Sequence, residues 1–162
     1  MVRSDKQGGK CPLQQEELAQ VRARMGDIDP RTRNPLQMAY VGDTIHDLYV
    51  RSLLLARGMS VGAMHRQAVH MVSAAAQARM LEAIEPMLTQ EEADVARRGR
   101  NAQAKHAAPR HADPADYALA TGLEALWGYL YITGRSERLD ALMNAALEDA
   151  QQAHDAPRAG KS

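Results

Sequence analysis

The chain has 162 residues, a length that suits one domain with its own hydrophobic core. Its 20 Lys and Arg residues balance its 20 Asp and Glu residues, so only a local cluster of cations would attract a nucleic acid. The single cysteine, Cys11, excludes an internal disulfide, and no apolar stretch is long enough to cross a membrane, which together favour a cytoplasmic protein.

The composition favours an all-α fold, because the chain has no Phe and relies on Leu, Ala, Val, Ile and Met for its core. No segment shows a strong strand pattern. Turn and capping signals divide the chain into about seven helices. We predict helices at 13–25, 34–57, 90–99 and 114–133. Three others are predicted to begin at about 61, 74 and 137, and the one that begins at 74 ends near 86.

Local signals set these helix boundaries. Asn34 before Pro35 predicts a helix start, because Asn caps free backbone amides and Pro is tolerated in the first turn. Thr89-Gln-Glu-Glu predicts a capping box at the start of the fifth helix. Gly99 and Gly134 are predicted to end the fifth and sixth helices.

Residues 1–12 and 154–162 are polar, lack periodicity and are expected to be disordered, which leaves 13–153 as the folded domain. Within that domain, 99–112 combines small residues, a proline and cations without any acid. It is predicted to be a loop of about a dozen residues, and loops of that length in compact domains are often functional.

Two isolated carboxylates stand out. Asp43 is the only charged residue in 35–45, and Glu124 is the only charged residue in 117–133. Each shares its helix face mainly with apolar or small side chains, and neither has an obvious Lys or Arg on the same face. An ionised carboxylate in such surroundings is costly unless a cation compensates for it.

If the two helices meet in the fold, Asp43 and Glu124 would form a site of hard oxygen ligands suited to Mg²⁺. The alternative is structural: each acid is paired with an arginine from elsewhere in the chain or lies at the wet edge of a groove. His46 and Asp47 could extend a metal site, but Asp47 is better placed for an ion pair with Arg51, four residues later.

A basic cluster follows the acidic start of the fifth helix. Arg97, Arg98, Arg100, Lys105 and Arg110 put five cations in 14 residues. Such a cluster can neutralise phosphates, and each arginine can donate two parallel hydrogen bonds to one phosphate. The alternative is a solvated charged turn at the C-terminal end of a helix, where cations are favoured in any case.

The motifs around the two acids resemble the catalytic domain of ribonuclease III. Tyr40-Val-Gly-Asp-Thr is similar to the signature helix of that family, and Thr121-Gly-Leu-Glu-Ala-Leu-Trp-Gly-Tyr-Leu is similar to its later catalytic helix. Arg98-Gly-Arg-Asn-Ala and Val72-Ser-Ala, followed by Gln77-Ala, extend the resemblance over about 34–148. The closest similarity is to the Mini-ribonuclease III branch of the family.

This resemblance implies that Asp43 and Glu124 are the catalytic, metal-binding acids of an endoribonuclease that cuts double-stranded RNA with Mg²⁺, or with Mn²⁺ in its place. An activated water would hydrolyse the phosphodiester and leave 5′-phosphate and 3′-hydroxyl ends. The implied partners are a second copy of the chain, precursor large-subunit (23S) ribosomal RNA and a ribosomal protein that presents it. As RNA contacts we predict Arg97, Arg98, Arg100, Asn101 and Lys105 of the basic segment. His65 and Gln77 are further candidates, for which a partly buried or surface structural role is an equal alternative.

The chain departs from the larger members of the family in two ways. Ala39 and Thr121 stand where those members carry two further acids, which leaves the number of metal ions open. After about residue 149 too few residues remain for their separate double-stranded-RNA-binding domain. We therefore expect the catalytic surface itself to hold the RNA.

Two other functions stay open on sequence grounds. One is a module of the same fold that binds duplex RNA without cutting it, although the retention of Asp43 and Glu124 argues against this. The other is a different all-helical metal hydrolase that acts on nucleotides, but neither isolated acid belongs to the Glu-x-x-Glu pairs common in such enzymes.

Overall fold

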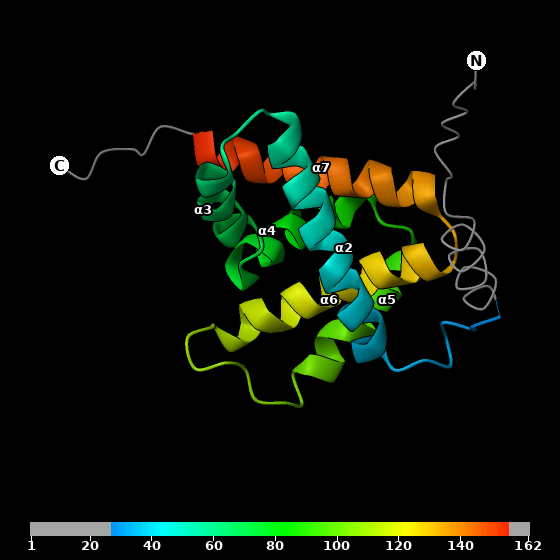
Figure 1. The fold of residues 1–162 in the computed structure, drawn as a ribbon. Helices are drawn as coiled ribbons and strands as arrows, with labels where there is room; N and C mark the ends of the chain where they lie inside the picture. Colours follow the sequence, from blue (N-terminus) through cyan, green and yellow to red (C-terminus); the bar gives the residue numbers. More distant parts are fainter. Residues whose placement is uncertain (1–26, 156–162) are drawn as a thin grey trace, which may run out of the picture.

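The computed structural model describes residues 27–155. Within this range it contains six α-helices, one 3₁₀ turn and no strand, which confirms the predicted all-α fold (Figure 1). The elements are α2 (Pro35–Ala56), α3 (Val61–Met71), α4 (Ala74–Ile84), η1 (Glu85–Met87), α5 (Gln90–Gln103), α6 (Pro114–Ile132) and α7 (Ser136–Asp155). The lead at 1–12 and the predicted helix at 13–25 lie outside the described residues, so the proposed domain division stays a prediction. Across the described part of the chain, no helix combines the length and hydropathy needed to span a membrane.

The predicted capping signals form as expected. The Asn34 side chain accepts a hydrogen bond from the Leu36 amide at 2.9 Å, directly before Pro35 in the first turn of α2. At the start of α5, Thr89 and Glu92 form a reciprocal capping box. These short-range bonds satisfy backbone amides that have no partner within their own helix, which is why the helix starts could be read locally.

The predicted end of the fifth helix was wrong. Helix α5 passes through Gly99 and continues to Gln103, so the connection to α6 covers 104–113 and Arg100 lies on the helix. A Cβ atom at Gly99 would lie 2.7 Å from the Ala125 Cβ and 3.1 Å from the Gly122 Cα, both on α6. Gly99 therefore permits two helices to pack closely rather than ending one of them.

Helix α6 occupies the centre of the molecule and packs against α2, α4, α5 and α7 (Figure 1). From Ala118 onward its side chains are almost all buried, Trp127 among them. A helix surrounded in this way cannot show a polar face, which explains why its sequence is apolar on every side. Glu124 lies in the middle of this buried helix.

Helices α2 and α6 cross with their backbones almost in contact. A Cβ atom at Gly42 would overlap the Glu124 carbonyl oxygen and would lie 2.9 Å from the Gly128 nitrogen. A Cβ atom at Gly128 would in turn overlap the carbonyl of Met38. Each glycine thus makes room for the main chain of the other helix, and the crossing point lies directly beside Asp43 and Glu124.

We predict that Gly42→Ala destabilises the fold by about 3 kcal/mol or more, because the added methyl group forces α2 away from α6. Gly62→Ala is the matched control: its Cβ would meet nothing nearer than a flexible arginine nitrogen, Arg66 Nη1, at 3.6 Å. It should leave the free energy of unfolding unchanged or raise it by roughly 0.5–1 kcal/mol. Urea denaturation of both variants measures the difference, and equal stabilities would contradict the close crossing.

Candidate active site

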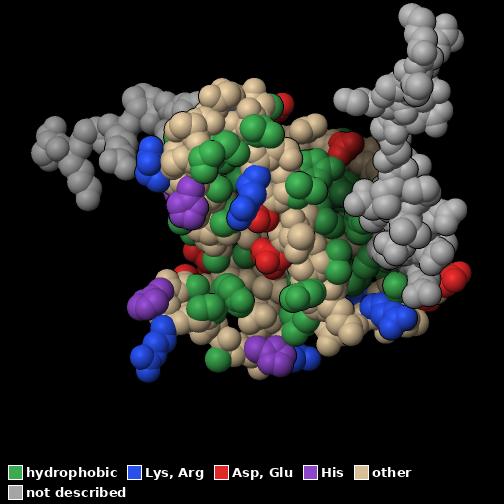
Figure 2. All heavy atoms as spheres, in the orientation of Figure 1, with side chains coloured by type: hydrophobic (Ala, Val, Ile, Leu, Met, Phe, Trp, Pro, Cys, Tyr) green, Lys and Arg blue, Asp and Glu red, His purple; other side chains and the backbone are tan. Residues whose placement is uncertain are grey.

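The fold brings the two isolated acids together. Asp43 on α2 and Glu124 on α6 line one cleft, of about 380 Å³, whose other walls come from the start of α4 and the end of α5. Gln77 and Thr121 also line it. Figure 2 shows acidic side chains near the middle of one face, with a Lys or Arg side chain directly beside them and further Lys, Arg and His side chains toward the edge.

Neither acid is neutralised by an arginine. Among the described residues, the ion pairs join other acids, including Asp47 with Arg51 at 2.9 Å as predicted. Pairing with an arginine, the first form of the structural alternative, is therefore not observed for either acid. Asp43 does lie exposed at the rim of the cleft, as the second form of that alternative expects. Glu124 lies deeper and is only partly exposed.

Glu92 provides a useful comparison, because it shows how this fold treats a buried acid with a structural role. Its side chain is 1% exposed, and Arg138 donates to both of its carboxylate oxygens at 2.9 Å. These hydrogen bonds lower the pKa of Glu92, so the carboxylate stays ionised. Glu124 has no such partner.

The surroundings of Glu124 raise its pKa to about 8. Burial is the largest cause, followed by the negative charge of Asp43 and a hydrogen bond between the two carboxyl groups. A hydrogen bond from Gln77 acts in the opposite direction. Two acids this close repel each other unless a proton or a cation lies between them, and perturbed acids in a cleft are typical of functional sites.

These residues fit a divalent cation held by few protein ligands. No group of three or more His, Cys, Asp or Glu side chains within 27–155 could hold a metal, so the two carboxylates act without further acids. Mg²⁺ is commonly bound in this way, through one or two carboxylates, water and substrate phosphate. The cleft has room for several waters, since one water takes up about 30 Å³.

The two residues that could have extended the metal site point elsewhere. His46 is fully buried, and its Nε2 lies 3.4 Å from the carbonyl oxygen of Met71. Burial lowers the pKa of this histidine. Asp47 is held by Arg51 on the same helix.

The predicted basic residues do not form one loop. Arg97 pairs with Asp94, and Arg98 donates to two backbone carbonyls in the segment before α2, those of Arg31 and Arg33, at 3.5 and 3.4 Å. Arg100 is exposed on α5. Three more of the predicted RNA contacts have exposed side chains: Asn101 on α5, Lys105 on the connection after α5, and His65 on α3.

Two further side chains in the cleft were not predicted. Tyr117 on α6 and Gln103 on α5 both line it. Tyr117 lies seven residues before Glu124 on the same face of α6, so its spacing carried a signal, whereas Gln103 reaches the cleft only because α5 packs on α6. Gln77, for which the sequence leaves both an RNA contact and a partly buried structural role open, is buried beside Glu124.

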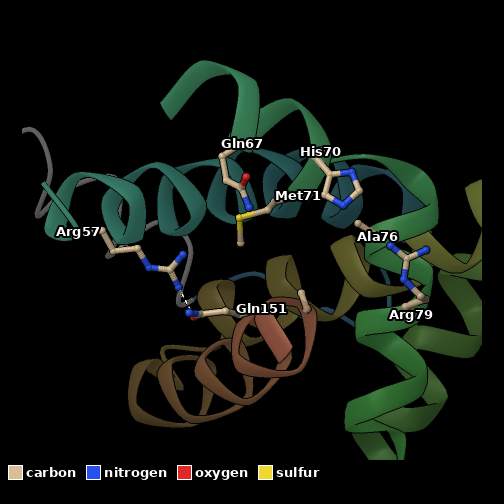
Figure 3. A pocket seen from close by; sticks show the side chains of 8 residues that line it. Arg57, Gln67, His70, Met71, Ala76, Arg79 and Gln151 are labelled. Carbon is tan, nitrogen blue, oxygen red and sulfur yellow. Dashed lines mark hydrogen bonds between the residues drawn. The ribbon is translucent and has the colours of Figure 1, made fainter. Parts of the chain in front are cut away.

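A second hollow lies on the other side of α4 and has a different chemistry (Figure 3). Arg57, His70 and Arg79 are among its lining residues, and Arg57 donates to the Gln151 side chain. No acid lines it. It therefore lacks the carboxylate oxygens that hold Mg²⁺, which the cleft around Asp43 and Glu124 provides.

Comparisons with known proteins agree with this geometry. The family model of the ribonuclease III domain matches residues 36–135. The chain is 50% identical over 121 residues to Mini-ribonuclease 3 of Symbiobacterium thermophilum, covering 74% of this chain and 92% of that protein. It is 40% identical over 130 residues to Mini-ribonuclease 3 of Enterococcus faecalis, covering 78% of this chain and 98% of that protein.

The fold also has a solved counterpart. A crystal structure of a protein from Fusobacterium nucleatum superimposes with a TM-score of 0.66 at 25% identity, covering 74% of this chain and 95% of that one. The helical fold and the matched family model together define a ribonuclease III domain, the catalytic unit of a class of endoribonucleases. Within that class, the chain belongs to the Mini-ribonuclease 3 family.

Proposed function

We propose that this chain is a Mg²⁺-dependent endoribonuclease that hydrolyses phosphodiester bonds in double-stranded RNA. The observation that carries the proposal is the meeting of Asp43 and Glu124 in one cleft without a compensating arginine. Membership of the ribonuclease III family supports the same reaction. Mn²⁺ can replace Mg²⁺ in this proposal, since both ions accept carboxylate and water oxygens.

Each acid has a distinct part in the proposed reaction. Asp43, exposed at the rim, faces the side from which RNA enters. Glu124, deeper in the cleft, would hold the cation as a carboxylate; burial and the charge of Asp43 raise its pKa, and a cation between the two acids would offset both effects. The bound Mg²⁺ supplies neutralisation of phosphate charge and a more acidic water for attack. The expected products carry 5′-phosphate and 3′-hydroxyl ends.

We further propose precursor 23S ribosomal RNA as the natural substrate, presented by a ribosomal protein in the cytoplasm. The support is the family of the relatives, together with a surface suited to duplex RNA. A-form RNA is recognised mainly through its shape, its phosphates and its 2′-hydroxyls, so cations around the cleft are sufficient to hold it without reading bases. Arg100 and Lys105 are exposed, and the ion pairs within 27–155 involve other cations.

The proposed enzyme is a homodimer joined through α2. Leu48 and Leu55 are 62% and 68% exposed, and seven residues apart they share one face of the helix. Tyr40, 82% exposed, lies at the edge of that face next to the cleft. A second copy of the chain would cover these apolar side chains, and two-fold symmetry would present one cleft to each strand of a duplex.

We expect Asp43→Asn and Glu124→Gln each to lower the rate of duplex cleavage in Mg²⁺ about a thousandfold, because each removes a charge worth several kcal/mol at the site. Asp47→Asn is the matched control on α2, since Asp47 pairs with Arg51 outside the cleft. Its rate should equal that of the wild type. Full cleavage by either cleft variant would contradict the mechanism, and a wild-type chain that binds duplex RNA without cutting it would indicate a non-catalytic module.

We expect Arg100→Ala and Lys105→Ala to weaken binding of duplex RNA by the cleavage-deficient Asp43→Asn protein. Each lost phosphate contact should reduce the slope of log affinity against log salt by about one. Arg31→Ala is the control, because Asp29 already offsets that exposed charge. Arg98 is unsuitable for this test, since it also holds the segment before α2. Unchanged slopes for both variants would place the RNA surface elsewhere.

We expect the combined Leu48→Lys and Leu55→Lys variant to sediment as a monomer, because four buried charges per dimer would face each other across the two-fold interface. Val69→Lys is the control, since Val69 on α3 is 58% exposed but lies off the proposed interface. Sedimentation equilibrium of the three proteins measures the result. A wild-type chain that is monomeric at micromolar concentration would contradict the dimer.

A further inference from the structure

Gln77 lies in the first turn of α4, between the Ser73 cap and the body of the helix. Its side chain is only 3% exposed, and it forms part of the wall of the acid cleft. A glutamine buried to this extent is uncommon, because each of its polar atoms loses water and needs a partner within the protein. The hydrogen bonds of the Gln77 side chain therefore indicate its role in the structure.

The amide nitrogen of Gln77 has two partners. Nε2 donates to the Glu124 Oε1 at 3.1 Å and to the backbone oxygen of Val72 at 3.1 Å. The Val72 oxygen can only accept, so the amide must present its nitrogen, and not its oxygen, to this side. Apart from Asp43, Gln77 is the side chain within 27–155 that bonds to Glu124.

The oxygen of the same amide has no partner. Gln77 Oε1 is buried and accepts no hydrogen bond within the described residues. Leaving a buried acceptor unpaired costs roughly 1–3 kcal/mol, a cost that a methionine or leucine at this position would avoid. A stability cost of this kind is expected where the group serves a functional site, here through its donating nitrogen.

The position of Gln77 is fixed by main-chain geometry. Val72 directly follows α3 as its C-terminal cap. The last residue of α3, Met71, lies with its carbonyl oxygen near the ring of His46, and His46 is three residues after Asp43 on α2. The turn between α3 and α4 is thus connected to α2 through His46 and to Glu124 on α6 through Gln77. Thr121 also lines the cleft, but its hydroxyl donates to the Tyr117 carbonyl at 2.9 Å and not to Glu124.

We propose that Gln77 is a positioning residue of the active site, which holds the Glu124 carboxylate in the orientation that meets Asp43 and a divalent cation. This inference rests on the proposed function, and it replaces the expectation that Gln77 contacts RNA. Such supporting hydrogen bonds orient metal-binding carboxylates in many proteins, and their loss typically lowers metal affinity or activity 10–100-fold. In a site with only two acids, the orientation of each one matters more, because no third carboxylate can compensate.

The test compares Gln77→Met with Gln103→Met. Both replace a glutamine that lines the cleft, but only Gln77 is hydrogen-bonded to an acid. Mn²⁺ affinity is measured by electron paramagnetic resonance on the RNA-free protein, and duplex affinity is measured without divalent cations. We expect Gln77→Met to lose roughly 10–100-fold in Mn²⁺ affinity. Its duplex affinity and its KM for RNA should match the wild type, while kcat falls; Gln103→Met should keep its Mn²⁺ affinity.

The outcomes separate the inference from the function on which it rests. Lower duplex affinity with unchanged Mn²⁺ affinity would overturn the inference and restore Gln77 as an RNA contact, and no change in either would also overturn it. Asp43→Asn serves as the reference: if that variant keeps its Mn²⁺ affinity, the proposed metal site itself is wrong. If Gln77→Met fails to fold, nuclear magnetic resonance of the ¹⁵N-labelled wild type decides. The Gln77 side-chain amide signals must then shift on addition of Mg²⁺, and unshifted signals would overturn the inference.

Discussion

The site depends on one close approach, the crossing of α2 and α6 at Gly42 and Gly128. At this point each helix leaves no space for a Cβ atom on the other. Asp43 follows Gly42 directly, and Glu124 lies one turn before Gly128, so the contact that brings the backbones together also brings the carboxylates together. A wider crossing would separate the two acids and remove the mutual repulsion that raises the pKa of Glu124. Packing and chemistry are therefore determined by the same pair of glycines.

The fold treats its buried acids in two different ways. Glu92 is compensated by Arg138 and ties α7 to the start of α5, which is a structural role. Glu124 receives only a neutral amide hydrogen from Gln77 and faces another acid. The first arrangement pairs the buried carboxylate with an arginine, whereas the second leaves two acids side by side without one. This contrast within one molecule is the physical basis for proposing a metal-binding role for Glu124 and a structural role for Glu92.

The basic residues on α5 and on the connection after it have unequal roles. Arg98 fixes the segment that leads into α2 through two backbone carbonyls, and Arg97 is offset by Asp94. Arg100 and Lys105 remain exposed for a polyanion. A chain with no net charge can in this way still present exposed cations locally.

The sequence by itself determined the helix starts, the all-α class and the two acids, because caps, periodicity and isolated charges act over a few residues. It also carried the family resemblance that the comparisons then bore out. Only the tertiary structure decided that Gly99 lies inside α5 and that Gln77 donates a hydrogen bond to Glu124. A glycine looks the same in sequence whether it ends a helix or admits a neighbouring one, and a glutamine looks the same on a surface or beneath it. The difference depends on which helices pack together, and α2, α4 and α6 meet only after the whole chain has folded around α6.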